Sequence, residues 1–333
     1  MTEQKQLLTL EKAIAFNPAY RAGWRDYLVA RSSAELAQLL DRLTTGLDDE
    51  SAQLCEAQID LMRRFAPHPL LRRLYLDEQV KRDLLPKATR LQLRGFGQFD
   101  VDGKSLSEIK RTLCLPEEPL PELLAHSGLR YIGDIARDTL KDSVIIDAGA
   151  YIGDTAKLFA TYYSPSKIYA LEPSPANYDR MCTLIDEWRL AGKIAPRQLA
   201  TSDRTGPIDL WGQGMGTSII QKAELAKTPG TRVEATSIDE LMVAEQETRR
   251  VGCIKLDVEG AEFATIKGAV GTIKKHRPVL IVSLYHTPID FFEIKPFIES
   301  LNLGYHFMIR KISDDFVKEL VLLCFVNELP SAA

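Results

Sequence analysis

Two glycines and two acidic side chains lie close together at residues 147–154, which read DAGAYIGD directly after a short apolar run. A strand that ends in a glycine-rich turn and continues into a helix brings the backbone close to a ligand at the carboxyl edge of a sheet. Gly149 allows this turn, and Gly153 allows the helix to pack near the strand. Glu172 follows the next apolar run, 19 residues beyond Gly153, where a carboxylate can accept both hydroxyls of a ribose. The pattern indicates a nucleoside-binding site.

The glycine spacing and the charge of this turn favour a cationic nucleoside. A nicotinamide dinucleotide fingerprint reads G-x-G-x-x-G, and its second glycine lets the backbone approach a pyrophosphate. Here the spacing is G-x-x-x-G, with Asp147 before it and Asp154 after it. Carboxylates at this position repel a pyrophosphate and attract the ammonium and sulfonium groups of S-adenosylmethionine. We therefore predict that methyl donor as the ligand. The alternatives are NAD on an atypical glycine loop, or a plain glycine turn with a helix-capping acid.

A second group of reactive side chains follows two later apolar runs. Residues 256–262 read LDVEGAE, and His286 ends the run after them. Asp257 and Glu259 are two residues apart and project alike while the chain is extended, and Glu262 falls one helical turn beyond Glu259. In an open α/β sheet such strand ends face one ligand crevice. We expect Asp257, Glu259 and His286 to converge on one pocket.

These side chains suit methyl transfer to oxygen, in which the acceptor must be aligned and its hydroxyl proton removed. His286 has the side-chain type best matched to general-base catalysis near neutral pH. Glu259 and Asp257 are the other catalytic candidates, and Asp257 can instead contact the donor or bind a divalent cation. Because no ligand spacing is diagnostic, a metal is not favoured. The structural alternatives are a histidine bonded to backbone and, for Glu259, an acid stabilised at a helix start.

The segments around these residues predict a parallel α/β sheet. From residue 143, short apolar runs alternate with amphipathic helices, which is typical of βαβ units. The residues GQGMGTS that follow a predicted strand at 208–211 are either a lid over the pocket or a hairpin turn. The other predicted strands are 144–146, 168–171, 198–200, 253–256, 279–282, 305–310 and 320–325.

The chain before residue 126 has a different character. Residues 1–95 contain almost no strand signal, and apolar residues such as Leu36, Leu40 and Leu43 recur at helical spacing. Residues 96–125 are rich in turn-forming glycine and proline. We therefore predict a helical N-terminal domain with its connector at 1–125 and a catalytic domain at 126–333.

The composition excludes several classes of protein. With 45% hydrophobic and 26% charged residues, the 333-residue chain is an ordinary globular protein, and its net charge of −4 argues against a nucleic-acid binder. Five cysteines without a C-x-x-C pair indicate a reducing compartment. No apolar run reaches the ~20 residues needed to cross a bilayer, and we expect no signal peptide from the first residues. We expect a cytoplasmic protein with a small-molecule or glycan acceptor, and we leave a homo-oligomer open.

Several ordered blocks resemble the FkbM family of class I methyltransferases. They read VIIDAGAYIGDTAKLFA, YALEPSPANY, LATSDRTG, IKLDVEGAEFATIKGA and VSLYHTPIDFFEI, and the resemblance covers about residues 128–326. It implies a Rossmann-like seven-stranded class I methyltransferase sheet with S-adenosylmethionine over the carboxyl edge of its first strands. The residues that it assigns to the donor are Asp147, Gly149 and Gly153 for the amino-acid end, Glu172 for the ribose, and Ser202 and Asp203 for the adenine.

We add Tyr151 and Asp154 of the glycine turn to the donor site, together with Asp257 at the end of a later strand. The resemblance implies an O-methyltransferase that acts on a hydroxyl of a sugar, glycan or secondary metabolite. The competing interpretations are an NAD-dependent oxidoreductase and a non-catalytic binding scaffold on a methyltransferase fold.

Overall fold

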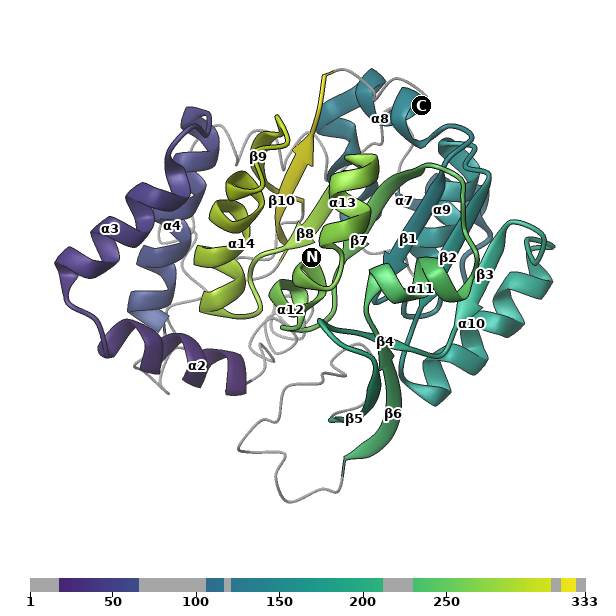
Figure 1. Ribbon diagram of the computed structural model, residues 1–333, viewed down its shortest axis with the longest axis horizontal. Helices are drawn as coiled ribbons and strands as arrows, with labels where there is room; N and C mark the ends of the chain where they lie inside the picture. The colour runs from purple at the N-terminus through teal and green to yellow at the C-terminus, as the bar shows by residue number, and fades with distance from the viewer. Residues whose placement is uncertain (1–17, 66–105, 117–120, 212–229, 313–318, 328–333) are drawn as a thin grey trace, which may run out of the picture.

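The computed structural model describes residues 18–65, 106–116, 121–211, 230–312 and 319–327 (Figure 1). Its centre is a seven-stranded sheet with the order β3 (Ile194–Arg197), β2 (Lys167–Leu171), β1 (Val144–Ala148), β7 (Val251–Leu256), β8 (Val279–Ser283), β10 (Leu320–Phe325) and β9 (His306–Lys311). Neighbouring strands from β3 to β8 are parallel, and β10 is antiparallel to both of its neighbours. The predicted seven-stranded Rossmann-like sheet is confirmed.

Each face of the sheet buries its own apolar side chains. Val144 and Ile146 of β1 belong to one core and Ile145 belongs to the other, because successive side chains of a strand point to opposite faces. Every residue of β7, β8 and β10 is buried, as expected for strands that are covered on both sides. One core includes side chains of α11 (Ile238–Ala244), α12 (Glu262–Lys267), α13 (Val270–His276) and α14 (Pro288–Ser300). The other includes side chains of α7 (Leu106–Leu113), α8 (Gly133–Leu140), α9 (Asp154–Tyr162) and α10 (Pro175–Glu187).

The prediction for the third strand is wrong. It lies at Ile194–Arg197 and not at 198–200, and its register on β2 ends where Arg197 pairs with Leu171. Pro196 lies within this edge strand, where a proline is tolerated but weakens the sequence signal. The chain then turns, and β4 (Ala200–Thr201) joins a separate small sheet of order β4-β6-β5, with β5 (Gly206–Leu210) and β6 (Thr231–Thr236). The GQGMGTS segment lies outside the described residues.

Three N-terminal helices lie against the edge of the main sheet: α2 (Pro18–Val29), α3 (Ser33–Thr44) and α4 (Asp49–Phe65) (Figure 1). Helix α3 begins with a capping box between Ser32 and Glu35, which satisfies two main-chain donors at its start. The three helices pack on α14 and β9 and share one core with the sheet. A separate domain ending at residue 125 stays a prediction.

All five cysteines are free in the structure. Within the ranges that the structure describes, no helix has both the length and the apolar character needed to cross a membrane.

Candidate active site

The glycine turn after β1 contacts the end of β7 through main-chain atoms. Gly149 has a φ of +77°, and a Cβ there would lie 1.8 Å from the main-chain oxygen of Asp257. Gly153 has a φ of +86°, and a Cβ there would lie 3.1 Å from the Met181 side chain. Both positions therefore require glycine. The structure shows Gly149 close to the Asp257 carbonyl, and the predicted approach of this turn to a ligand stays a prediction.

Glu172 is buried at the end of β2 and holds the glycine turn in place. Its carboxylate accepts hydrogen bonds from the main-chain N–H groups of Tyr151 (3.0 Å) and Ser174 (2.9 Å) and from the Asn177 amide (3.2 Å). Burial raises the pKa of Glu172, and these hydrogen bonds oppose the rise. A carboxylate has about four acceptor positions, so this arrangement leaves about one for a ligand. The prediction that Glu172 accepts hydrogen bonds from both ribose hydroxyls requires two free acceptor positions.

Asp147 does not line the site as predicted. Its side chain is fully buried, and Lys255 Nζ lies 3.2 Å from its Oδ1 and donates to the Gly149 carbonyl at 3.0 Å. Burial raises the pKa of Asp147, and Lys255 opposes the rise. A buried charge needs a counter-charge, so this acid neutralises Lys255. The sequence signal for this pair is Lys255 within an otherwise apolar strand.

Asp154 and Tyr151 remain at the surface of the turn, where each is partly exposed. Asp154 is the first residue of α9, and its Oδ1 accepts a hydrogen bond from Thr155 N at 2.8 Å. Burial raises the pKa of Asp154 to about 6. Most of its carboxylate is therefore charged at neutral pH, which suits a cationic ligand.

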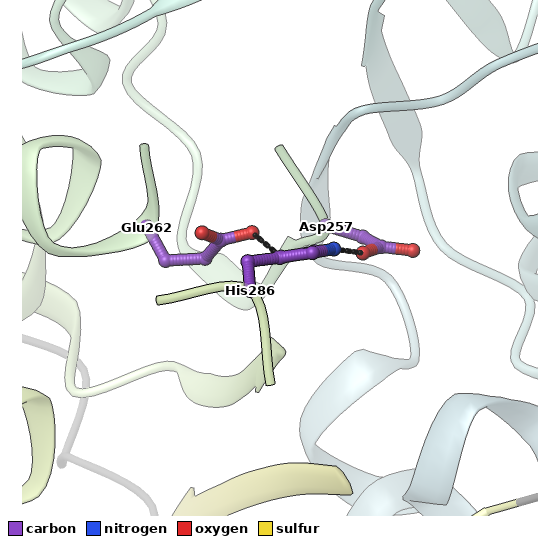
Figure 2. Close-up of side chains that lie close together, drawn as sticks. All are labelled: Asp257, Glu262 and His286. Carbon is purple, nitrogen blue, oxygen red and sulfur yellow. Dashed lines mark hydrogen bonds and ion pairs between the residues drawn. The ribbon is translucent and has the colours of Figure 1, made fainter. Parts of the chain in front are cut away.

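Figure 2 shows the His286 imidazole between the carboxylates of Glu262 and Asp257. Its Nδ1 lies 2.7 Å from Glu262 Oε1, and its Nε2 lies 3.6 Å from Asp257 Oδ1 and 3.8 Å from Glu259 Oε1. The imidazole and Glu262 are fully buried, while 33% of the Asp257 side chain and 23% of the Glu259 side chain are exposed. The expected convergence of Asp257, Glu259 and His286 is present.

The His286 imidazole carries a positive charge, whereas a general base is expected to be neutral. Burial lowers its pKa, but the negative charges of Glu262 and Glu259 outweigh burial and raise the pKa to about 10. The imidazole is therefore protonated at neutral pH in this arrangement. A general base must start without the proton, so this charge favours a neighbouring carboxylate as the base, and the catalytic role of His286 stays a prediction.

The turn between β7 and α12 explains the position of Glu262. Glu259 and Gly260 have φ values of +56° and +105°, and α12 begins only at Glu262. The Glu262 carboxylate accepts hydrogen bonds from the main-chain N–H groups of Val258 (2.8 Å) and Gly260 (2.9 Å). The prediction of one helical turn between the two glutamates is wrong, because a left-handed turn separates them.

Several residues of the site were not recognised in the sequence. The Tyr285 hydroxyl lies 3.4 Å from Asp257 Oδ1 and 3.2 Å from Glu319 Oε1. Glu122 lies in the 3₁₀ turn Pro121–Leu123, where burial and Glu319 raise its pKa. Acids that approach from distant parts of the chain carry no local sequence signal, because their spacing along the chain is unrelated to their distance in the fold.

Ser202 and Asp203 lie in the connection after β4. Ser202 donates a hydrogen bond to Asp203 Oδ1 at 3.2 Å, and Lys267 Nζ lies 3.6 Å from Asp203 Oδ2. A Cβ at Gly268 would lie 2.2 Å from the Ser202 carbonyl, so this connection packs closely on the end of α12. Their role toward adenine stays a prediction.

A divalent cation also has suitable donors here. Asp257, Glu262 and His286 each place a ligand atom within 4.8 Å of the others, and several ions accept such mixed oxygen and nitrogen donors. In this structure Glu262 is engaged by the imidazole and by two main-chain N–H groups. Metal use, which the sequence does not favour, stays a prediction.

Comparison with known proteins gives consistent matches. Residues 147–309 match the model of the methyltransferase FkbM domain. The hexuronic acid methyltransferase AglP of Haloferax volcanii is 24% identical over 177 residues, which cover 53% of this chain and 70% of AglP. Methyltransferase 1 of Beauveria bassiana is 25% identical over 177 residues, which cover 48% of this chain and 71% of that protein.

A solved structure shows the same fold over most of the chain. Methyltransferase FkbM from Methylobacillus flagellatus KT superposes with a TM-score of 0.58 at 17% identity. The match covers 92% of this chain and 62% of that protein, so this chain spans less than two thirds of its length.

The sheet order and the glycine turn after its first strand define a class I methyltransferase fold. The chain carries a methyltransferase FkbM domain at residues 147–309. The resemblance noted in the sequence is confirmed, and so is the prediction of a methyltransferase. The roles of the individual side chains stay predictions.

Proposed function

We propose that this protein transfers a methyl group from S-adenosylmethionine to a hydroxyl of a sugar, glycan or related metabolite. The observation that carries the proposal is the main-chain contact between Gly149 and Asp257. This contact places the glycine turn, whose negative charge suits a cationic nucleoside, beside carboxylates that can accept the proton of a hydroxyl. AglP, a hexuronic acid methyltransferase, supports a carbohydrate acceptor.

The residues present fit the donor. The partly exposed Asp154 and Asp257 offer negative charge to a cation, and Glu172 keeps an acceptor position for a ribose hydroxyl. Tyr151, whose main chain bonds to Glu172, completes this side of the site. S-adenosylmethionine supplies an electrophilic methyl group on a positively charged sulfur.

The carboxylates of Asp257 and Glu259 are the candidate proton acceptors. Burial raises the pKa of Asp257, but the positive charges of Lys255 and His286 outweigh burial and hold this pKa below its usual value. The protonated imidazole of His286 lies near both carboxylates and stabilises their charged forms. In this mechanism His286 orients the carboxylates, and one of them accepts a hydrogen bond from the acceptor hydroxyl and then its proton.

We further infer a reducing compartment such as the cytoplasm, because all five cysteines are free. The net charge of −4 supports a small-molecule or glycan acceptor over a nucleic acid.

Titration calorimetry with S-adenosylmethionine and NAD tests the donor. We expect micromolar binding of S-adenosylmethionine and none of NAD, followed by transfer of labelled methyl groups to members of a neutral and acidic sugar panel. Binding of NAD alone would overturn the proposal.

The Glu172→Ala variant tests the nucleoside site. We expect affinity for S-adenosylmethionine to fall roughly tenfold or more, because a hydrogen bond to a charged group contributes about 1.5–3 kcal/mol and the main chain at Tyr151 loses its acceptor. Glu245→Gln, in an ion pair with Arg197, is the matched control. Unchanged affinity in Glu172→Ala would remove the ribose assignment.

A further inference from the structure

Helix α2 contacts the connection that carries His286. The indole N–H of Trp24 lies 3.3 Å from the main-chain oxygen of Tyr285 and donates a hydrogen bond to it, and this contact joins residues 261 positions apart in the chain. Trp24 is fully buried, and so is the His286 side chain. The hydrogen bond therefore fixes the main chain immediately before the histidine.

The Trp24 ring also contacts the far side of the same connection. It packs edge-on against Phe291 at 5.4 Å and lies 6.4 Å from Phe292, measured between ring centres. Both phenylalanines belong to α14, which begins just after His286 and is capped by the Thr287 side chain. One side chain thus contacts the chain before His286 and the helix after it.

The short segment between these two contacts carries reactive groups. The Tyr285 hydroxyl approaches Asp257, and the His286 imidazole approaches Asp257 and Glu262. The His286 imidazole is fully buried and cannot rotate into solvent, so its position is set by the position of its main chain. Misplacement of a reactive group by about 1 Å can lower a rate about a hundredfold.

We propose that Trp24 is a positioning residue of the active site, which holds the Tyr285–His286 main chain so that the imidazole meets its carboxylates. This inference rests on the proposed function and extends it to α2, which lies outside the matched methyltransferase domain at residues 147–309. The N-terminal helices then form part of the catalytic apparatus as well as of the core.

The Trp24→Phe variant tests the proposal, because it keeps an aromatic ring and removes the N–H donor. We expect kcat to fall roughly tenfold to a hundredfold, while the dissociation constant for S-adenosylmethionine stays unchanged. The imidazole resonances of His286, assigned in ¹⁵N-histidine-labelled protein by their loss in His286→Gln, should shift. This NMR readout requires no turnover, so it tests the positioning even if the proposed reaction is wrong.

Tyr27→Leu is the matched control. Tyr27 lies on the same helix and stacks on Phe292 with ring centres 5.6 Å apart, so its loss weakens the same interface and leaves the Tyr285 carbonyl bonded. We expect a lower melting temperature with unchanged kcat and unchanged His286 resonances. Equal loss of kcat in both variants would show a general stability effect and overturn the proposal.

If Trp24→Phe does not fold, benzothienylalanine at position 24 answers the same question, because it keeps the shape of the indole and lacks only the N–H. A shifted His286 spectrum with intact donor binding supports the positioning role. An unchanged His286 spectrum in a folded variant without the N–H overturns it.

Discussion

At the residue scale, the site depends on charges that are buried and paired. Lys255 and Asp147 lie inside the sheet, and the charges of Asp147 and Asp257 raise the pKa of Lys255 although burial opposes the rise. The pair connects β7 to the glycine turn, because the same ammonium group donates to the Gly149 carbonyl. Its removal should therefore affect both stability and donor binding.

We expect Lys255→Met to lower the free energy of unfolding by about 3–5 kcal/mol, because it leaves Asp147 as an uncompensated buried charge. Urea denaturation measures the change. In the Lys255→Met/Asp147→Asn double variant the charge is gone, and most of the lost stability should return. A single variant as stable as the wild type would show that Asp147 is already neutral in the fold.

The charge of His286 gives a prediction about pH. Its pKa is raised from 6.5 to about 10, so proton binding stabilises the fold fully below pH 6.5, and this contribution is lost as the pH rises toward 10. The free energy of unfolding of the wild type should fall over this range more steeply than that of His286→Gln, by up to about 1.4 kcal/mol per pH unit. Parallel curves for the two proteins would contradict a protonated His286.

We also expect His286→Gln to lose turnover and to keep donor binding in calorimetry.

The sequence predicts which reactive residues meet but not their charges. Asp257, Glu259 and His286 follow neighbouring strands, so the rule for strand ends in open sheets is sufficient to bring them together. The state of His286 depends on Glu262, and the position of Glu262 depends on a left-handed turn at Glu259. Spacing along the chain cannot reveal this conformation, because glutamate rarely adopts it.

At the scale of elements, the glycine turn shows why one residue type is required. Gly149 and Gly46 have nearly the same φ, +77° and +76°, but only Gly149 has a close neighbour. The two glycines therefore separate the effect of backbone strain from the effect of close packing.

We expect Gly46→Ala to destabilise the protein by about 1–2 kcal/mol through strain alone. Gly149→Ala should lose a further 1–3 kcal/mol through overpacking, together with affinity for S-adenosylmethionine. Thermal unfolding and calorimetry on both variants measure the difference. If the two variants behave alike, the contact between the turn and Asp257 does not constrain the site.

The strands that carry the site were predicted more accurately than the edge of the sheet. The runs at 144–146, 253–256 and 279–282 lie in fully buried strands, where a continuous apolar pattern is a strong signal. The edge strand β3 contains Pro196 and is only partly buried, so its pattern is weak. This weak pattern is the reason why the predicted position of β3 was wrong.

At the scale of the whole molecule, the N-terminal helices and the sheet behave as one packed unit. The Arg310 guanidinium of β9 forms ion pairs with Asp48 and Glu50 at the start of α4, and Arg42 of α3 forms one with Glu293 of α14. The helical periodicity of this region was readable from the sequence. Its partners were not, because they lie more than two hundred residues further along the chain.

The contact between the ends of β1 and β7 has a consequence for how the specificity of the site can change. Asp257 N donates to the Ala148 carbonyl at 3.1 Å, and the Asp257 carbonyl faces the α-carbon of Gly149. In the proposed mechanism, the distance between the methyl donor and Asp257 is therefore set by peptide groups, which every amino acid shares. Substitutions at Tyr285 or Glu319, whose side chains contact each other beside Asp257, should therefore change the acceptor side of the site without changing this distance.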